Sequence, residues 1–143
     1  MRLLFDTNIV LDLLLDREPF STRVALLFSE VEKGELSGYL CATTMTTVHY
    51  LARKAIGAKK ATREVGKLLS LFEIAPVNRP VLEAALRSKF PDFEDAVVHE
   101  AALHVGVDGI VTRDIRGFRR ATVPVYSPEE LIQILRVRDE ATE

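Results

Sequence analysis

Residues 2–8 read RLLFDTN, and this stretch decides the fold. Its three consecutive apolar residues leave no polar side chain for a solvent face, so they predict a strand that is buried on both sides. Such strands belong to parallel sheets covered by helices. The strand ends at Asp6, and in open α/β sheets ligands collect beyond the carboxyl ends of the strands. A buried carboxylate there needs a cation or hydrogen-bond donors as its partner.

The rest of the chain alternates short apolar segments with segments of helical spacing. The apolar segments predict further strands at residues 38–42, 74–77, 109–112 and 123–126. Pro124 places the last of these at a sheet edge, and residues 127–130 (SPEE) form a capping box for a final helix. Thr43 and Thr44 are expected to cap the helix after the second strand. The alternation predicts a three-layer α/β/α domain with a mainly parallel central sheet, and residues 1–143 as a single domain.

Composition and charge exclude several classes of protein. Hydrophobic residues make up 48% of the chain, which is typical of a globular domain and not of a disordered one. No apolar run is long enough to cross a bilayer and no signal peptide precedes the first strand, so we expect a cytoplasmic protein with no membrane partner. A net charge of −2 argues against a protein that coats nucleic acid by charge alone. It leaves open an enzyme that reaches phosphate through a bound metal.

Acidic residues gather at three separate points of the sequence. Asp6 and Asp114 each follow a predicted strand, and Asp92 and Asp95 share one face at the start of a predicted helix, with Glu94 to the side. Acidic residues in a first helical turn also favour the helix dipole, so capping alone would explain the third group.

The combination points to metal chemistry. Carboxylates that converge on one point repel each other, and their pKa values rise unless a cation lies between them. A ligand set made only of oxygen atoms suits Mg²⁺ or Mn²⁺ and not zinc. Such ions polarise phosphoryl oxygens and activate water, so the pattern predicts metal-assisted phosphodiester or phosphate chemistry.

Three motifs resemble those of the PIN domain family, whose best-known bacterial members are the VapC-type toxin ribonucleases. The motifs are LFDTNIVLD at residues 4–12, DFEDA at 92–96, and VTRD at 111–114 followed by Phe118. Their order matches that of the family, and the resemblance extends from residue 2 to about residue 132, nearly the whole chain.

The resemblance implies a Mg²⁺- or Mn²⁺-dependent endoribonuclease that cuts single-stranded RNA, the toxin of a toxin–antitoxin pair, with an antitoxin protein as partner and a homodimer as assembly. It assigns both catalysis and metal binding to Asp6, Asp95 and Asp114. It assigns supporting roles around them to Asn8, Thr112 and Asp92.

One departure from the family pattern concerns the helix after the second strand. The family usually carries an acidic residue there, and this chain has Thr47 instead. A neutral hydroxyl removes one negative charge from the site, and Glu94 or a water could substitute for it. The departure keeps open a second hypothesis, a catalytically weak or inactive PIN-like module that binds RNA or a protein.

Basic and aromatic residues supply candidates for RNA contacts. Arg113 and Arg116 adjoin the predicted metal site and could bind phosphate. Tyr50 and Phe118 are the candidates for base stacking. A second basic cluster is interpreted as an ordinary solvated face, and it consists of Lys54, Lys59, Lys60 and Arg63.

Two other enzyme classes fit the sequence poorly. His99-Glu100 followed by His104 resembles the HExxH zinc motif, but the second histidine is one position too late to share a helix face, so we expect His99 to be structural. A haloacid-dehalogenase-like phosphatase also places an aspartate after the first strand. That chemistry needs a second aspartate two positions later, where this chain has Asn8.

Overall fold

A five-stranded parallel sheet forms the centre of the computed structural model, which describes residues 1–142. The strand order is β3-β2-β1-β4-β5, and every neighbouring pair is parallel. The strands are β1 (Arg2–Phe5), β2 (Ser37–Cys41), β3 (Glu73–Ala75), β4 (Gly109–Val111) and β5 (Val125–Tyr126). The parallel sheet predicted from the sequence is therefore confirmed. The prediction of a single domain stays a prediction, and its last residue, 143, lies outside the described residues.

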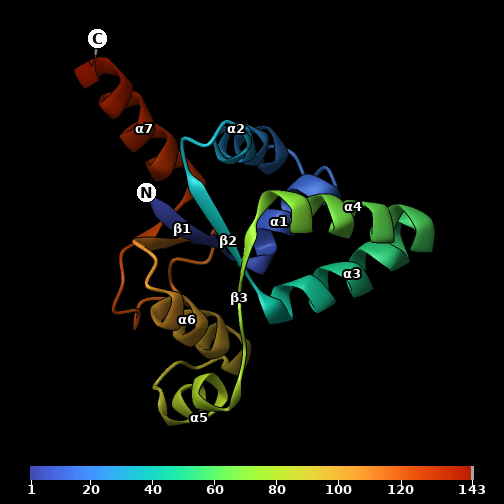
Figure 1. Ribbon diagram of the computed structural model, residues 1–143, viewed down its shortest axis with the longest axis vertical. Helices are drawn as coiled ribbons and strands as arrows, with labels where there is room; N and C mark the ends of the chain where they lie inside the picture. The colour runs from blue at the N-terminus through green and yellow to red at the C-terminus, as the bar shows by residue number, and fades with distance from the viewer. Residues whose placement is uncertain (143) are drawn as a thin grey trace.

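Helices cover both faces of this sheet, as Figure 1 shows. One face carries α1 (Thr7–Leu14), α2 (Phe20–Glu32), α3 (Ala42–Ile56), α4 (Ala58–Leu71) and α7 (Pro128–Thr142). The other face carries α5 (Arg79–Arg87) and α6 (Phe93–Val105). The three-layer prediction is confirmed, and the two layers of helices differ in size.

Strand β1 lies at the middle of the sheet and is buried on both faces. Leu3 and Phe5 contribute to the core under α1–α4, whereas Leu4 contributes to the core under α5 and α6. All three side chains are 0% exposed, as their unbroken apolar run predicts. The Phe5 ring makes edge-to-face contacts with Phe28 and Phe72 at centroid distances of 5.5 and 5.7 Å.

Helix ends follow the sequence signals at some positions and depart from them at others. Ser127 and Glu130 form the predicted capping box: the Glu130 N–H donates to Ser127 Oγ at 3.1 Å, and the Ser127 N–H donates to Glu130 Oε1 at 3.0 Å. The predicted caps Thr43 and Thr44 are wrong, because α3 begins at Ala42 with Cys41 as its N-cap, two residues before Thr43. No helix within residues 1–142 has both the length and the apolar character needed to cross a membrane.

Candidate functional site

Asp6 lies where β1 meets α1, and both elements fix its carboxylate. Its backbone N–H continues the sheet by donating to the Val111 carbonyl at 2.9 Å. Its side chain is the N-cap of α1, since Oδ1 accepts from the Thr7 N–H at 2.8 Å. The residue is only 5% exposed. A carboxylate so placed is held rigidly at the carboxyl edge of the sheet.

The Thr112 hydroxyl links Asp6 to the loop that follows β4. It donates to Asp6 Oδ2 at 2.8 Å and accepts from the Asp114 N–H at 3.0 Å. Asn8 Nδ2 donates to the same hydroxyl at 3.3 Å and to Asp6 Oδ2 at 3.4 Å. Thr112 is 0% exposed and uses its one donor and both acceptor positions, so the network leaves its hydroxyl no freedom. Asn8 and Thr112 thus lie beside Asp6, where the family resemblance places them.

Asp114 and the first turn of α6 complete the acidic group. Asp114 Oδ1 accepts from the Gly117 N–H at 2.9 Å, which closes a short loop after β4. Asp92 is the N-cap of α6, with Oδ1 accepting from the Asp95 N–H at 2.9 Å. The capping interpretation of Asp92 is therefore confirmed. Glu94 and Asp95 follow in the first turn of the helix.

The carboxylates of this group lie near enough to influence one another's pKa values. Burial is the main cause that raises the pKa of Asp6, and the charges of Glu94 and Asp114 raise it further against the hydrogen bonds from Thr112 and Thr7. Burial also raises the pKa of Asp95 to about 7, helped by the charges of Asp6, Asp92, Asp114 and Glu94. Glu94, which was expected to lie to the side of the site, thus raises the pKa of both Asp6 and Asp95. Aspartates separated by up to 108 positions in the chain gather at one edge of the sheet.

The donor set fits a hard divalent cation in its chemistry, though not in its present spacing. Its ligands would all be carboxylate oxygens. Burial and then neighbouring negative charges raise the pKa of Asp6 and that of Asp95, and a cation would relieve the repulsion between those charges. Within residues 1–142, however, no three Asp, Glu, His or Cys side chains are close enough to share one ion as they stand. Binding would therefore require side chains to turn toward each other, and exposed Asp114 and half-buried Asp95 have room to do so.

Helix α3 contributes hydroxyl groups beside this acidic group. The Thr44 hydroxyl lies 2.9 Å from that of Thr7, and Thr44 is 0% exposed. Thr47 lies half-buried one turn further along α3. The sequence interpretation missed Thr7 and Thr44 as supports of the site, because only their pairing across 37 positions reveals the role.

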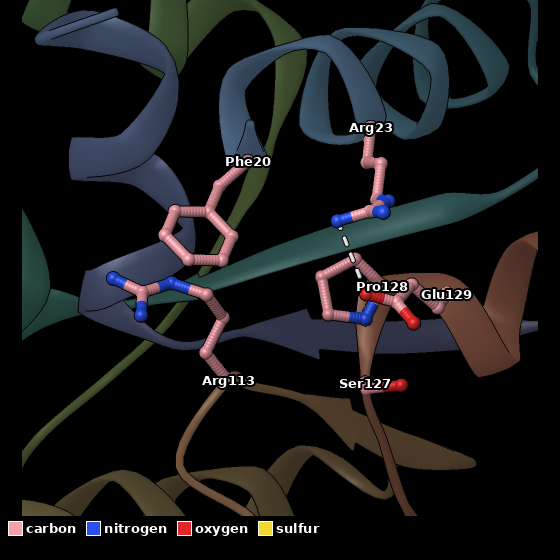
Figure 2. A pocket seen from close by; sticks show the side chains of 6 residues that line it. All are labelled: Phe20, Arg23, Arg113, Ser127, Pro128 and Glu129. Atoms are coloured by element: carbon pink, nitrogen blue, oxygen red, sulfur yellow. Dashed lines mark ion pairs between the residues drawn. The ribbon is translucent and has the colours of Figure 1, made fainter. Parts of the chain in front are cut away.

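Arg113 lies with its guanidinium turned into the protein. Its Nε and Nη2 donate to the two oxygens of Asp12 at 2.5 and 3.0 Å, and Asp12 is 0% exposed. The guanidinium also lies 4.1 Å from the centre of the Phe20 ring. Figure 2 shows this stack on the wall of a cavity of about 210 Å³ that Arg23 also lines, with Arg23 paired to Glu129 at 3.1 Å. An RNA contact by Arg113 stays a prediction, and it would compete with Asp12.

Four other residues singled out in the sequence differ in how exposed they are. Arg116 lies beside Asp114, with Arg119, in a shallow surface hollow. Phe118 is only 1% exposed, so the prediction that it stacks on bases is wrong. Tyr50 is 58% exposed and remains available. His99 is structural, as expected: it is 3% exposed, stacks on Phe90 and accepts from the Thr122 N–H at 3.0 Å.

Solved structures of similar fold include several toxin–antitoxin proteins. A toxin–antitoxin complex from Klebsiella pneumoniae is 26% identical, with 87% of this chain and 96% of that chain covered and a TM-score of 0.64. FitAcB from Neisseria gonorrhoeae is 23% identical, with coverage of 88% and 97% and a TM-score of 0.67. VapC20 from Mycobacterium tuberculosis, described as a Sarcin-Ricin loop cleaving toxin, is 14% identical, with coverage of 76% and 86% and a TM-score of 0.62.

Sequence comparison gives the family directly. Among curated proteins, none matches this sequence. The family model described as PIN domain matches residues 2–116, which contain β1 to β4 and every acidic residue of the site. The chain therefore belongs to the PIN domain family.

Proposed function

We propose that this chain is a divalent-metal-dependent endoribonuclease that hydrolyses phosphodiester bonds of single-stranded RNA as the toxin of a toxin–antitoxin pair. One observation carries the proposal: the Thr112 hydroxyl joins buried Asp6 to the loop that bears Asp114. Burial, with the charges of neighbouring carboxylates adding to it, raises the pKa of Asp6 and that of Asp95. Membership of the PIN domain family supports it.

Asp6, Asp95 and Asp114 would hold the Mg²⁺ or Mn²⁺ ion, which when bound polarises a phosphoryl oxygen and lowers the pKa of a water molecule. The other residues of the site orient these carboxylates. Thr112 and Asn8 fix the Asp6 oxygens by hydrogen bonds, and Asp92 fixes the backbone at Asp95. Glu94 lies in the first turn of α6, near Asp6 and Asp95, and supplies a charge that Thr47 on α3 cannot.

RNA would approach over the loop after β4. Arg116 and Arg119 are exposed and line the same hollow as Asp114, so a phosphate near the carboxylates lies within reach of both guanidinium groups. Arg113 precedes Asp114 directly, and its pairing with Asp12 fits a role in holding this loop in place.

An antitoxin partner is proposed from the similarity to the Klebsiella pneumoniae toxin–antitoxin complex, of which 96% of the matched chain is covered. A homodimer and a cytoplasmic location complete the proposal.

The test is cleavage of single-stranded RNA in the presence of Mn²⁺ by wild type and Asp95→Asn. We expect wild type to cut and the variant to lose at least about 100-fold in rate, since even outer-shell partners of a metal contribute 10- to 100-fold. Asp139→Asn is the matched control, because Asp139 is an exposed residue of α7, and it should cut like wild type. EDTA should stop the reaction.

Two alternatives give different results in the same assay. If wild type and Asp95→Asn both bind RNA and neither cuts it, the chain is a binding module, the reading that Thr47 favours. Turnover of a small phosphate monoester would point to the phosphatase, which the family match leaves without support.

A further inference from the structure

The tip of the α3–α4 hairpin carries a concentration of positive charge that the catalytic site does not use. Residues 53–63, called the hairpin tip here, contain five Lys and Arg and no Asp or Glu, in a chain whose net charge is −2. All five basic residues are exposed: Arg53, Lys54, Lys59, Lys60 and Arg63.

These charges have no carboxylate partner within the part of the chain that the structure describes. Within residues 1–142, none of the five forms an ion pair, and eight other Lys and Arg side chains form none either. The hairpin tip differs in having five of them among eleven consecutive residues. The nearest acidic residue along the chain, Glu64, pairs with Lys67 at 3.2 Å and leaves the hairpin tip uncompensated. A solvated face usually mixes both signs, so the interpretation of this cluster as an ordinary surface does not explain it.

The helix dipole favours only some of these basic residues where they stand. Arg53 and Lys54 lie in the last turn of α3, where cations are favourable. Lys59 and Lys60, by contrast, lie in the first turn of α4, which contains no acidic residue, and there the dipole disfavours cations. Acidic residues would serve helix stability better at these positions. Basic residues in a first helical turn that gain no stabilising contact there indicate a functional role.

The hairpin connects this charge to the catalytic edge of the sheet. Helix α3 begins directly after β2, and its Thr44 contacts Thr7 beside Asp6. Its 15 residues then carry the chain about 20 Å away, at 1.5 Å per residue. Figure 1 shows α3 and α4 side by side, projecting from the sheet as an arm with the hairpin tip at its far end. A polyanion at the carboxylates could therefore follow α3 to the tip.

An exposed aromatic ring lies along this path. Tyr50 is 58% exposed on α3, and Lys54 Nζ lies 4.4 Å from the centre of its ring. Proteins that bind single-stranded nucleic acid without reading its sequence combine basic side chains for the backbone with aromatic rings for the bases. An acidic protein would match the charge alone, whereas RNA matches both the charge and the ring.

We propose that the hairpin tip binds the phosphate backbone of the RNA whose other end occupies the carboxylate site. This inference rests on the proposed ribonuclease function and adds a second contact region to it. The tip thereby gives affinity for RNA long enough to span both regions, and gives none for a short RNA that fills the catalytic site alone.

The experiment compares two triple variants of the full chain. The test variant is Lys59→Gln with Lys60→Gln and Arg63→Gln. The control is Lys33→Gln with Arg136→Gln and Arg138→Gln, which removes the same charge from exposed positions on the α2 end and α7. Substrates are a single-stranded RNA of about 16 nucleotides and one of about 4, the range that single-strand sites cover. Binding is measured in an Asp95→Asn background, and cleavage without that change.

We expect the test variant to bind the long RNA about 10- to 100-fold more weakly, and its plot of log affinity against log salt to be less steep by about 2, since each lost phosphate contact on a single strand removes about 0.7. Cleavage of the short RNA should not change. Thermal unfolding should occur at the wild-type temperature or slightly above it, because two cations leave a helix N-terminus. The control variant should behave as wild type throughout.

Each contrary result has a distinct meaning. If wild type cuts RNA and the test variant binds long RNA as wild type does, the hairpin-tip proposal is wrong and the ribonuclease proposal stands. An equal loss in the control variant also overturns it, because net charge then explains the effect. If the test variant loses only the binding of a poly-glutamate peptide, the occupant is an acidic protein and not RNA. If wild type neither binds nor cuts either RNA, the ribonuclease proposal fails as well.

Discussion

Burial and neighbouring charges both oppose the negative charge of Asp6 and of Asp95. Burial is the largest cause of the raised pKa in each, and the other carboxylates of the site add to it. Thr112 and Thr7 offset part of the cost for Asp6 through hydrogen bonds. Carboxylates selected for folding alone would not be gathered in this way, which is why raised pKa values cluster at functional sites.

The pKa of Asp95 gives a pH dependence that can be measured. Folded Asp95 keeps its proton up to about pH 7, whereas an unfolded chain loses it near 3.8. The folded state therefore binds more protons between these values, and the free energy of unfolding of metal-free protein should fall as the pH rises from about 4 to 7. Urea unfolding in EDTA at pH 5 and pH 8 should show a larger loss for wild type than for Asp95→Asn.

Adding Mn²⁺ at pH 8 should restore stability to wild type more than to Asp95→Asn, because the cation relieves repulsion that the variant lacks. Equal pH profiles for the two proteins would contradict this account of Asp95.

The pair between Asp12 and Arg113 gives a second prediction. Asp12 is 0% exposed, and removing its bidentate partner leaves a buried carboxylate with only Arg17 nearby, at 3.7 Å. Breaking a buried pair costs about 3–5 kcal/mol, and because the Arg113 side chain is 32% exposed we expect Arg113→Gln to lower the free energy of unfolding by about 2–3 kcal/mol. The surface pair Arg79–Glu83 is the control, and Arg79→Gln should change stability by less than about 0.5 kcal/mol. Similar losses in both variants would show that the Asp12 pair is no stronger than a surface pair.

At the scale of elements, close contacts fix where strands and helices can lie. Strand β2 passes under the last residues of α4, where Gly38 faces the ring of Phe72. A methyl group on Gly38 would lie 2.6 Å from two carbons of that ring, which packs against the rings of Phe5 and Phe28. The absence of a side chain at Gly38 is thus a condition for the position of β2 under α4.

Gly38→Ala should therefore lower the free energy of unfolding by about 1–3 kcal/mol, as overpacking of a core does. Gly66→Ala is a control of opposite sign: nothing lies within 4 Å of an added methyl group at Gly66 in α4, and alanine should raise helix stability by about 0.5–1 kcal/mol. Denaturant unfolding of both variants measures the difference. A stable Gly38→Ala protein would mean that Phe72 can move.

At the scale of the whole molecule, the sequence predicts what depends on local pattern and misses what depends on distant partners. The apolar run of β1, the capping box at Ser127 and the position of Asp6 could be predicted because period and cap chemistry are local. The Asp12–Arg113 pair joins residues 101 positions apart, and no spacing rule links them. Phe118 was misjudged for the same reason, since loop residues can be buried by elements far along the chain.

The candidate site shows the same division. The motifs predict which aspartates belong to the site, but the influence of Glu94 on Asp6 and Asp95 depends on how α6 packs against the sheet. The sequence shows that the hairpin tip is basic, but whether a carboxylate compensates it depends on residues brought near it by the fold.

The position of β1 between β2 and β4 has a consequence for the order in which a ribosome delivers this protein. Strand β1 can pair with β2 once residue 41 has emerged, but its other neighbour spans residues 109–111. Asp6 and Asp114 can consequently lie at the same edge of the sheet only after residue 114 has been synthesised. A nascent chain that stops short of that residue has no assembled acidic group.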